Sequence, residues 1–193
     1  MQSDTFFKPL FTGKLLRLAA PHPEDSGVFA RWSNDDNYLR HFENDPARPM
    51  TAQQYADWER PHLNAPNNYM FRLRTLEDAR PDADKLIGVV ALGDVQWVHR
   101  TAMLGVAIGE RAYRGRGYGA EAIRLILRYG FEELNLYRIW LTTISFNLAA
   151  MRCYERAGFV REGAQRGMFE REGRRFDLLH YGMLRDEWRD APP

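Results

Sequence analysis

The chain has a single cysteine, almost no net charge and no long apolar run. Cys153 has no second cysteine to pair with, which excludes an internal disulfide and a multi-cysteine metal site and suits a reducing compartment. The 27 basic and 26 acidic residues leave a net charge of +1, so we expect neither nucleic acid nor an anionic membrane as a partner. No apolar run approaches the roughly 18 residues of a membrane span, and the first residues lack the pattern of a signal peptide. These absences predict a cytoplasmic globular protein.

The length and the order of periodic segments predict one domain. The 193 residues, 45% of them hydrophobic, suffice for one sizeable core and are few for two domains. Strand and helix periodicities alternate so that antiparallel meanders flank a single βαβα unit, which predicts an α/β (α+β) fold with a mixed sheet. Residues 34–50 are polar and proline-broken and are expected to form a loop. The expected strands are 13–19, 69–76, 86–92, 99–109, 137–144, 159–163 and 175–184; the expected helices lie near 25–34, 51–61, 120–134 and 147–158, with a hairpin loop at 77–84.

A glycine-rich turn between a strand and a helix is the most informative stretch. Residues 114–120 read Arg-Gly-Arg-Gly-Tyr-Gly-Ala and lead directly into an amphipathic helix. Such a turn presents unpaired backbone N–H groups at the positive end of a helix dipole, where a phosphate or pyrophosphate binds. Its glycines let the backbone approach the anion closely, and Arg114 and Arg116 add positive charge. A turn that merely connects two elements is the alternative.

The sequence around this turn argues against two alternatives, a dinucleotide-binding turn and a Walker loop. Gly115, Gly117 and Ala120 satisfy the dinucleotide pattern Gly-x-Gly-x-x-Gly/Ala. However, the turn follows a meander, and the next strand ends in Leu-Thr-Thr-Ile without the acidic residue that a Rossmann unit places there. A Walker loop is excluded because no Gly-Lys-Ser/Thr is present.

The turn also carries the pattern Arg/Gln-x-x-Gly-x-Gly/Ala, in Arg114, Gly117 and Gly119. A second element follows the next strand, and a third lies near the C-terminal end. With these three elements in order, the chain resembles the general N-acetyltransferase (GNAT) superfamily, whose members use acetyl-CoA. The third element looks like the RimJ/RimL-type branch, the ribosomal-protein N-terminal acetyltransferases. The second and third elements read Asn147-x-x-Ala150-x-x-x-Tyr154-x-x-x-Gly158-Phe159 and Asp177-x-x-x-Tyr181-x-x-Leu184-x-x-Glu187-Trp188.

This resemblance implies a single GNAT-type domain over residues 1–193. It implies about seven strands, helices on both faces, and a splayed central pair of strands, here the fourth and fifth, with the pantetheine arm between them. The coenzyme-binding core would cover about 86–163, and acceptor-side elements about 21–62 and 164–188.

The resemblance also implies contacts with acetyl-CoA. The backbone of Val106, Ala107 and Ile108 would pair with the pantetheine amides, and one of their N–H groups would polarise the acetyl carbonyl. The pyrophosphate would bind the N–H groups of the turn, which belong to Gly115, Arg116, Gly117, Tyr118, Gly119 and Ala120, beside Arg114. Asn147 is expected to cap its helix, and the resemblance adds a bond to the pantetheine arm.

Acetyl transfer from a thioester to an amine requires two proton movements, for which two residues are candidates. Tyr154 is the candidate general acid, because the resemblance places its hydroxyl near the coenzyme sulfur; a structural helix tyrosine is the alternative. Glu110, just after the fourth strand, could accept the amine proton directly or through water. A solvated loop carboxylate is the alternative for Glu110, and the other candidate bases are His99, His180 and Tyr181.

The remaining reactive side chains indicate neither an acyl-cysteine nor a metal. Cys153 is adjacent to Tyr154, and neighbouring helix positions point about 100° apart, so we interpret Cys153 as a packing residue. His22, His41 and His62 lie beside prolines or in polar loops without metal-ligand spacing, which predicts no metal site.

The acceptor is expected to enter opposite the coenzyme, between the loops 34–50 and 167–174. Carboxylates at this entrance would favour a cationic amine, which could be a protein N-terminus, a polyamine or an aminoglycoside. Ordinary solvated loop charges are the alternative, and the branch resemblance favours a protein N-terminus. The acidic residues are Asp35, Asp36, Glu43, Asp45, Glu170 and Glu172, diluted by Arg171, Arg174 and Arg175.

Three functions therefore remain open. The leading one is an acetyl-CoA-dependent N-acetyltransferase in which the amine attacks directly within a ternary complex. The second is a non-catalytic acyl-CoA-binding sensor or regulatory module of the same fold, against which the retained Tyr154 argues. The third is a nucleotide-dependent oxidoreductase, which the missing acidic residue and the strand order disfavour. The sequence leaves a homodimer open as the assembly.

Overall fold

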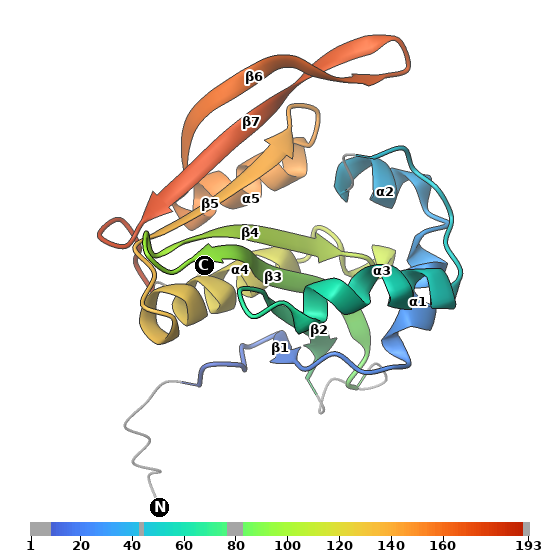
Figure 1. Ribbon diagram of the computed structural model, residues 1–193, viewed down its shortest axis with the longest axis horizontal. Helices are drawn as coiled ribbons and strands as arrows, with labels where there is room; N and C mark the ends of the chain where they lie inside the picture. The colour runs from blue at the N-terminus through green and yellow to red at the C-terminus, as the bar shows by residue number, and fades with distance from the viewer. Residues whose placement is uncertain (1–8, 43–44, 77–82, 191–193) are drawn as a thin grey trace, which may run out of the picture.

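The computed structural model describes residues 9–42, 45–76 and 83–190. Figure 1 shows a twisted sheet with helices packed against it and a long hairpin extending from one end. In chain order the elements are β1 (Leu16–Ala19), α1 (Asp25–Trp32), α2 (Asp36–Phe42), α3 (Ala52–Asn64), β2 (Tyr69–Thr75), β3 (Leu86–Gln96), β4 (Thr101–Ile108), η1 (Arg111–Tyr113), α4 (Tyr118–Arg128), η2 (Tyr129–Glu133), β5 (Arg138–Ile144), α5 (Leu148–Ala157), β6 (Val160–Arg171) and β7 (Arg174–Leu184).

The seven strands form one sheet in the order β1-β2-β3-β4-β5-β7-β6. All neighbouring strands are antiparallel except β4 and β5, which are parallel and are connected through α4. The mixed, mostly antiparallel sheet with its single βαβα unit is therefore confirmed.

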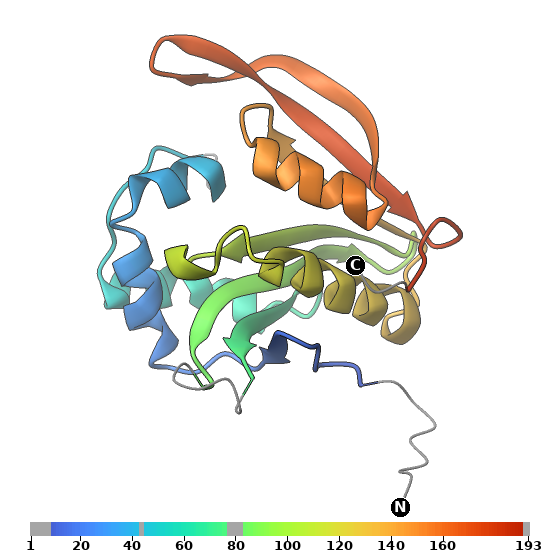
Figure 2. The ribbon, with the colours of Figure 1, turned by 180° about the vertical axis from the view of Figure 1, so that it is seen from behind.

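Helices cover both faces of the sheet because the strands bury residues alternately on each side. Val90 of β3 belongs to the main core, which lies under α4 and α5. The neighbouring residue Val89 belongs to a second cluster with Phe29 of α1 and Leu39 of α2. Figure 2 shows α4 and α5 side by side on the face nearer the viewer. The expected helices on both faces are thus confirmed.

The amphipathic helix after the glycine turn is the centre of the main core. Ile123, Ile126 and Leu127 of α4 are at most 2% exposed. On its first turn, the buried Glu121 carboxylate accepts hydrogen bonds from the backbone N–H groups of Lys14, Leu15 and Leu16, at 2.6 to 3.0 Å. These bonds attach the start of β1 to the beginning of α4.

Three sequence expectations about elements were wrong in this part of the chain, and a fourth is not tested. Residues 34–50 contain α2 rather than only loop, because Asp35 caps a short helix that is too brief to show a periodic pattern. The sequence predicts that the second helix ends at Pro61, whereas α3 continues through Pro61 to Asn64. β3 extends to Gln96 rather than ending at Leu92. The expected hairpin loop 77–84 lies mostly outside the described residues, as 77–82 do not belong to them.

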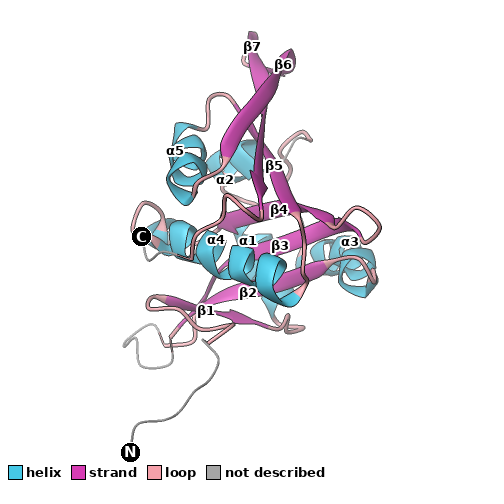
Figure 3. Ribbon diagram, turned by 90° about the vertical axis from the view of Figure 1, so that its left-hand side faces the viewer, coloured by secondary structure: helices cyan, strands magenta, loops and turns pink. Residues whose placement is uncertain are grey.

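The largest difference is the C-terminal hairpin. The sequence predicts a strand that ends at residue 163 and a loop over 167–174, whereas β6 continues to Arg171 and the loop is only a tight turn at Glu172 and Gly173. Most residues of β6 are exposed and lack the alternation that marks a half-buried strand. Figure 3 shows the tip of this hairpin projecting beyond the rest of the sheet.

Candidate active site

The central strands β4 and β5 separate along their length. They pair only where Thr101–Met103 lies beside Arg138–Trp140, and no further register between them is present in the described residues. On its other side β4 remains paired with β3 as far as Ile108. The segment Leu104–Ile108, which contains Val106, Ala107 and Ile108, therefore has no strand partner on the side of β5. This is the splayed pair that the sequence predicts.

The glycine turn lies between the end of β4 and the start of α4. Gly115 and Gly117 have φ angles of +72° and +90°, in the left-handed region that glycine adopts without strain. Gly117 directly precedes the first helical residue, Tyr118. In the part of the chain that the structure describes, the N–H groups from Gly115 to Ala120 make no backbone hydrogen bond outside the first turn of α4. The turn therefore keeps donors available at the positive end of the α4 dipole, which fits an anionic diphosphate.

The turn and the unpaired edge of β4 are adjacent. A methyl group built on Gly119 would lie 3.9 Å from Cγ1 of Ile108. The ring of Tyr118 packs edge-on against Tyr113, with centroids 5.1 Å apart. A ligand held by the N–H groups of the turn can therefore continue along the edge of β4.

The two arginines of the turn differ in their surroundings. Arg116 is exposed and forms no ion pair in the described chain, so its charge is available to an anion. The Arg114 guanidinium instead donates to the carbonyl oxygens of Ile108 (2.9 Å) and Gly109 (2.6 Å) and pairs with Asp35. Arg116 can therefore offer its positive charge to an anion, whereas the charge of Arg114 is already paired with Asp35.

Tyr154 lies on α5, is 8% exposed, and packs near Phe159 and Tyr181. Burial, followed by the nearby Cys153, raises the pKa of the Tyr154 phenol above its ordinary value. Its hydroxyl has no hydrogen-bond partner in the described chain, yet it is not among the fully enclosed unpaired atoms. The phenol is therefore protonated at neutral pH, and its hydroxyl is unpaired within the described chain.

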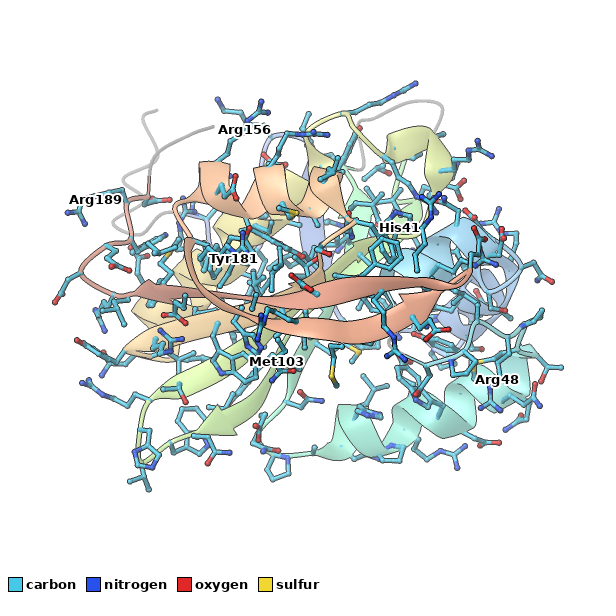
Figure 4. The ribbon with its side chains drawn as sticks, turned by 90° about the horizontal axis from the view of Figure 1, so that it is seen from above. His41, Arg48, Met103, Arg156, Tyr181 and Arg189 are labelled. Atoms are coloured by element: carbon cyan, nitrogen blue, oxygen red, sulfur yellow. The ribbon has the colours of Figure 1, made fainter. Side chains whose placement is uncertain are left out.

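Asn147 caps α5 as the sequence predicts. Its side-chain oxygen accepts the N–H of Ala150 at 3.1 Å. The side-chain nitrogen reaches the carbonyl oxygen of His41 at 3.4 Å, which links α5 to α2. The His41 ring also packs edge-on against Phe146, with centroids 5.1 Å apart. Figure 4, viewed from above, shows His41 near the beginning of α5.

Glu110 directly follows β4, and its side chain is 17% exposed. One carboxylate oxygen accepts a hydrogen bond from Arg31 of α1 at 3.1 Å, and the other has no partner in the described chain. The structure therefore places Glu110 at the divergent end of β4 with one oxygen open.

The other candidate bases are placed less favourably. His99 lies in the turn before β4, at the end where β4 and β5 still pair. The Tyr181 hydroxyl donates to Glu155 on α5 at 3.0 Å, so it is already engaged. His180 lies on β7, and its Nε2 atom is buried without a partner in the described residues. Cys153 is half-buried against the main core, and burial raises its pKa, which agrees with a packing role.

The acidic side chains expected at the acceptor entrance are mostly paired with arginine. The pairs are Asp35 with Arg114 (3.0 Å), Glu172 with Arg40 (2.7 Å) and Glu170 with Arg175 (2.8 Å). Asp36 and Asp45 form no ion pair in the described chain, and Glu43 lies outside the described residues. Within those residues, no group of three metal-ligating side chains gathers, and no helix is long and apolar enough to cross a membrane.

The fold, with its divergent parallel strands and glycine turn, is that of an acyl-CoA-dependent acyltransferase. The acetyltransferase (GNAT) domain family matches residues 16–160. An uncharacterized, SPbeta prophage-derived N-acetyltransferase of Bacillus subtilis is 30% identical over 178 residues, covering 92% of this chain and 94% of that protein. The chain therefore belongs to the GNAT family and is an acetyl-CoA-dependent N-acetyltransferase.

Two further comparisons concern a protein from Vibrio cholerae. Its spermidine N(1)-acetyltransferase is 28% identical over 173 residues, covering 90% of this chain and 95% of that protein. The crystal structure of spermidine N-acetyltransferase from V. cholerae in complex with CoA and spermine superimposes with a TM-score of 0.78 at 25% identity, covering 89% and 96% of the two chains. These similarities extend over nearly the whole fold.

Proposed function

We propose that this enzyme transfers the acetyl group of acetyl-CoA to a primary amine of a small, polyamine-type molecule, by direct attack within a ternary complex. The observation that carries the acetyl transfer is the unpaired edge of β4 beside a glycine turn with free N–H donors. Support for the acceptor comes from the similarity to a spermidine acetyltransferase over nearly the whole chain.

In this proposal the coenzyme lies along the residues that the sequence singles out. The N–H groups from Gly115 to Ala120 and the free guanidinium of Arg116 bind the diphosphate. The backbone of Val106, Ala107 and Ile108 pairs with the pantetheine amides, and one of these N–H groups donates to the acetyl carbonyl oxygen, where negative charge develops. Asn147 holds the pantetheine arm from the opposite side.

The reaction requires a C–N bond to form as the C–S bond breaks. The amine nitrogen attacks the thioester carbonyl, and the sulfur leaves with the electron pair of the C–S bond. Tyr154 donates its phenolic proton to that sulfur as negative charge develops there. The open oxygen of Glu110 receives the proton that the amine loses, directly or through one water.

A protein N-terminal amine is the second candidate acceptor. The pairing of Asp35, Glu170 and Glu172 with arginines removes much of the negative charge that would select a polycation. An acceptor with one amine does not need that charge. The C-terminal element Asp177 to Trp188, which resembles the RimJ/RimL-type branch, points the same way.

A thiol-release assay with acetyl-CoA separates the two candidates. The panel contains spermidine, spermine, an aminoglycoside, and lysine-free peptides with either a free or a blocked N-terminus. Saturable thiol release with spermidine and none with peptides supports the polyamine; release only with the free N-terminus supports the second candidate. Tight acetyl-CoA binding without any release would refute both and would support the non-catalytic acyl-CoA sensor. A cytoplasmic location and a homodimer stay predictions, and size-exclusion chromatography with light scattering tests the latter.

A further inference from the structure

Arg114 begins the proposed coenzyme turn, but its side chain points back into the protein. Its Nε and Nη2 atoms donate to the carbonyl oxygens of Ile108 and Gly109, where β4 ends. Nη2 also lies 3.0 Å from a carboxylate oxygen of Asp35, and the guanidinium lies 5.5 Å from the centre of the Tyr38 ring. These contacts of Nε and Nη2 tie the turn to the protein, so these two groups are not directed to a phosphate.

Asp35 connects this arginine to α2. One carboxylate oxygen pairs with Arg114, while the other accepts the N–H of Tyr38 at 3.1 Å. The carbonyl oxygen of Asp35 accepts the N–H of Leu39, also at 3.1 Å. Burial alone would raise the pKa of Asp35, but these N–H and guanidinium contacts outweigh it and lower the pKa. Asp35 is therefore the charged cap at the start of α2.

α2 in turn contacts the opposite half of the molecule. Arg40 pairs with Glu172 at the tip of the β6–β7 hairpin, at 2.7 Å. His41 contacts Phe146 and accepts a hydrogen bond from Asn147, both just before α5. Figures 1 and 2 show α2 across the gap in the ribbon from α5. The seven residues of α2 thus join the β4 side of the site to the β5 side.

The end of β4 is held from the other direction by α1. The Trp32 ring lies against Gly109 so closely that a methyl group there would come within 2.1 Å of Cε3. The backbone at Ile108 and Gly109 is therefore fixed between Trp32 and the Arg114 guanidinium. Arg114 directly precedes the turn, and its guanidinium contacts both the end of β4 and Asp35, so it connects the turn to the start of α2.

We propose that the Arg114–Asp35 ion pair is a positioning pair that couples coenzyme binding at the Gly115–Ala120 turn to the placement of α2 over the acceptor side. A bound diphosphate orders the turn and thereby fixes the position of Arg114. Arg114 then fixes Asp35, the charged cap of α2. With its cap fixed, α2 keeps its contacts with Glu172 and Phe146. The proposal rests on the proposed coenzyme site at the turn. By reciprocity, a well-placed α2 favours coenzyme binding to the same extent.

Hydrogen exchange with and without acetyl-CoA tests this coupling and needs no acceptor. In the wild type we expect acetyl-CoA to slow exchange both at residues 115–120 and in α2, at residues 38–42, by at least threefold. In Asp35→Asn, the asparagine still caps α2 but carries no charge for Arg114. We expect this variant to keep the protection at 115–120 and to lose it in α2, and we expect the same of Arg114→Gln. Asp36→Asn, which removes a neighbouring carboxylate without an ion pair, is the matched control and should behave as the wild type.

The outcomes distinguish the coupling from the coenzyme site. Absence of protection at 115–120 in the wild type would refute the coenzyme site itself. Protection at 115–120 without any in α2, or α2 protection that persists in Asp35→Asn, would overturn the coupling alone. If Arg114 were instead a phosphate ligand, Arg114→Gln would weaken acetyl-CoA binding at least tenfold while Asp35→Asn would not, which also overturns the proposal. With an accepted amine, the two single variants and the double variant should raise the acceptor KM by a similar factor, because they interrupt one connection.

Discussion

Arg72 and Glu59 form an ion pair at 2.6 Å in which the two side chains are only 1% and 6% exposed. Arg72 belongs to β2 and Glu59 to α3, and Arg72 also pairs with Asp25 of α1 at 3.0 Å. The same guanidinium lies 4.7 Å from the centre of the Phe29 ring. One buried arginine of the sheet thus holds both α1 and α3.

Glu59→Gln should strongly destabilise the protein, because it leaves the buried Arg72 charge without this partner. Removing one member of a buried pair costs about 3 to 5 kcal/mol. The matched control is Asp57→Asn, which breaks the exposed pair of Asp57 with Arg60 on the same helix and should cost at most about 1 kcal/mol. Urea unfolding followed by circular dichroism measures both. Equal effects of the two substitutions would contradict a structural role for the Arg72 network.

The sequence predicts the βαβα unit around the glycine turn better than the segments before and after it. The βαβα unit is encoded locally, since the glycine turn, the apolar stripe of α4 and the cap at Asn147 are each visible in a few adjacent residues. Arg72 illustrates the opposite case. An arginine in a strand gives no local sign of burial, because its partners lie 13 and 47 residues earlier in the chain.

Helix α2 and the full length of β6 cannot be predicted from the sequence for the same physical reason. α2 is seven residues long and depends on Asp35, Tyr38 and contacts with distant segments rather than on a periodic pattern. β6 is stabilised by its pairing with β7, and its exposed residues show no alternation. The contact between Arg114 and Asp35 also gives no local sign, because the two residues lie 79 positions apart in the chain. Signals of this kind emerge from the tertiary structure.

Gly115→Ala should weaken acetyl-CoA binding in addition to lowering the stability of the protein. Alanine at a φ of +72° costs about 1 kcal/mol, and relief of this strain reorients the N–H groups of the turn. Gly173→Ala is a matched control, because Gly173 has a φ of +71° and likewise has no atom within 4 Å of the added methyl group. We expect similar losses of thermal stability but at least a fivefold higher acetyl-CoA Kd only for Gly115→Ala. Isothermal titration calorimetry measures the acetyl-CoA Kd of both variants. Equal Kd values for Gly115→Ala and Gly173→Ala would show that the turn does not belong to the coenzyme site.

Substitutions of Asn147 should separate its cap from its proposed contact with the pantetheine arm. Asn147→Asp keeps an oxygen that accepts the Ala150 N–H but loses the amide donor, whereas Asn147→Ala loses both. We expect Asn147→Ala to lose about 1 kcal/mol of stability and Asn147→Asp to lose much less. Both variants should bind acetyl-CoA more weakly, by severalfold. Wild-type affinity in Asn147→Asp would limit this residue to capping.

The folded protein should lose stability at alkaline pH partly through Tyr154. Burial raises the pKa of Tyr154 in the folded state, so the unfolded chain releases this proton first as the pH rises. The stabilising contribution is therefore complete below the unfolded pKa of about 10 and declines above it, by about 1.4 kcal/mol per pH unit. Urea unfolding of the wild type and of Tyr154→Phe should give parallel stabilities from pH 7 to 9 and a steeper decline of the wild type above pH 10. Curves that remain parallel above pH 10 would show that the Tyr154 pKa is not raised.

Tyr154→Phe should lower turnover at least tenfold and leave the acetyl-CoA Kd nearly unchanged. Phenylalanine keeps the ring contacts with Phe159 and Tyr181 but has no proton to give the departing sulfur. Tyr181→Phe is the matched control: it removes the hydroxyl that donates to Glu155, so it should cost about 1 kcal/mol of stability while turnover stays within twofold. Turnover is measured by thiol release with the best acceptor of the panel, and the Kd by calorimetry. An unaltered rate in Tyr154→Phe would remove Tyr154 from the mechanism, because phenylalanine has no proton that it could donate to the sulfur.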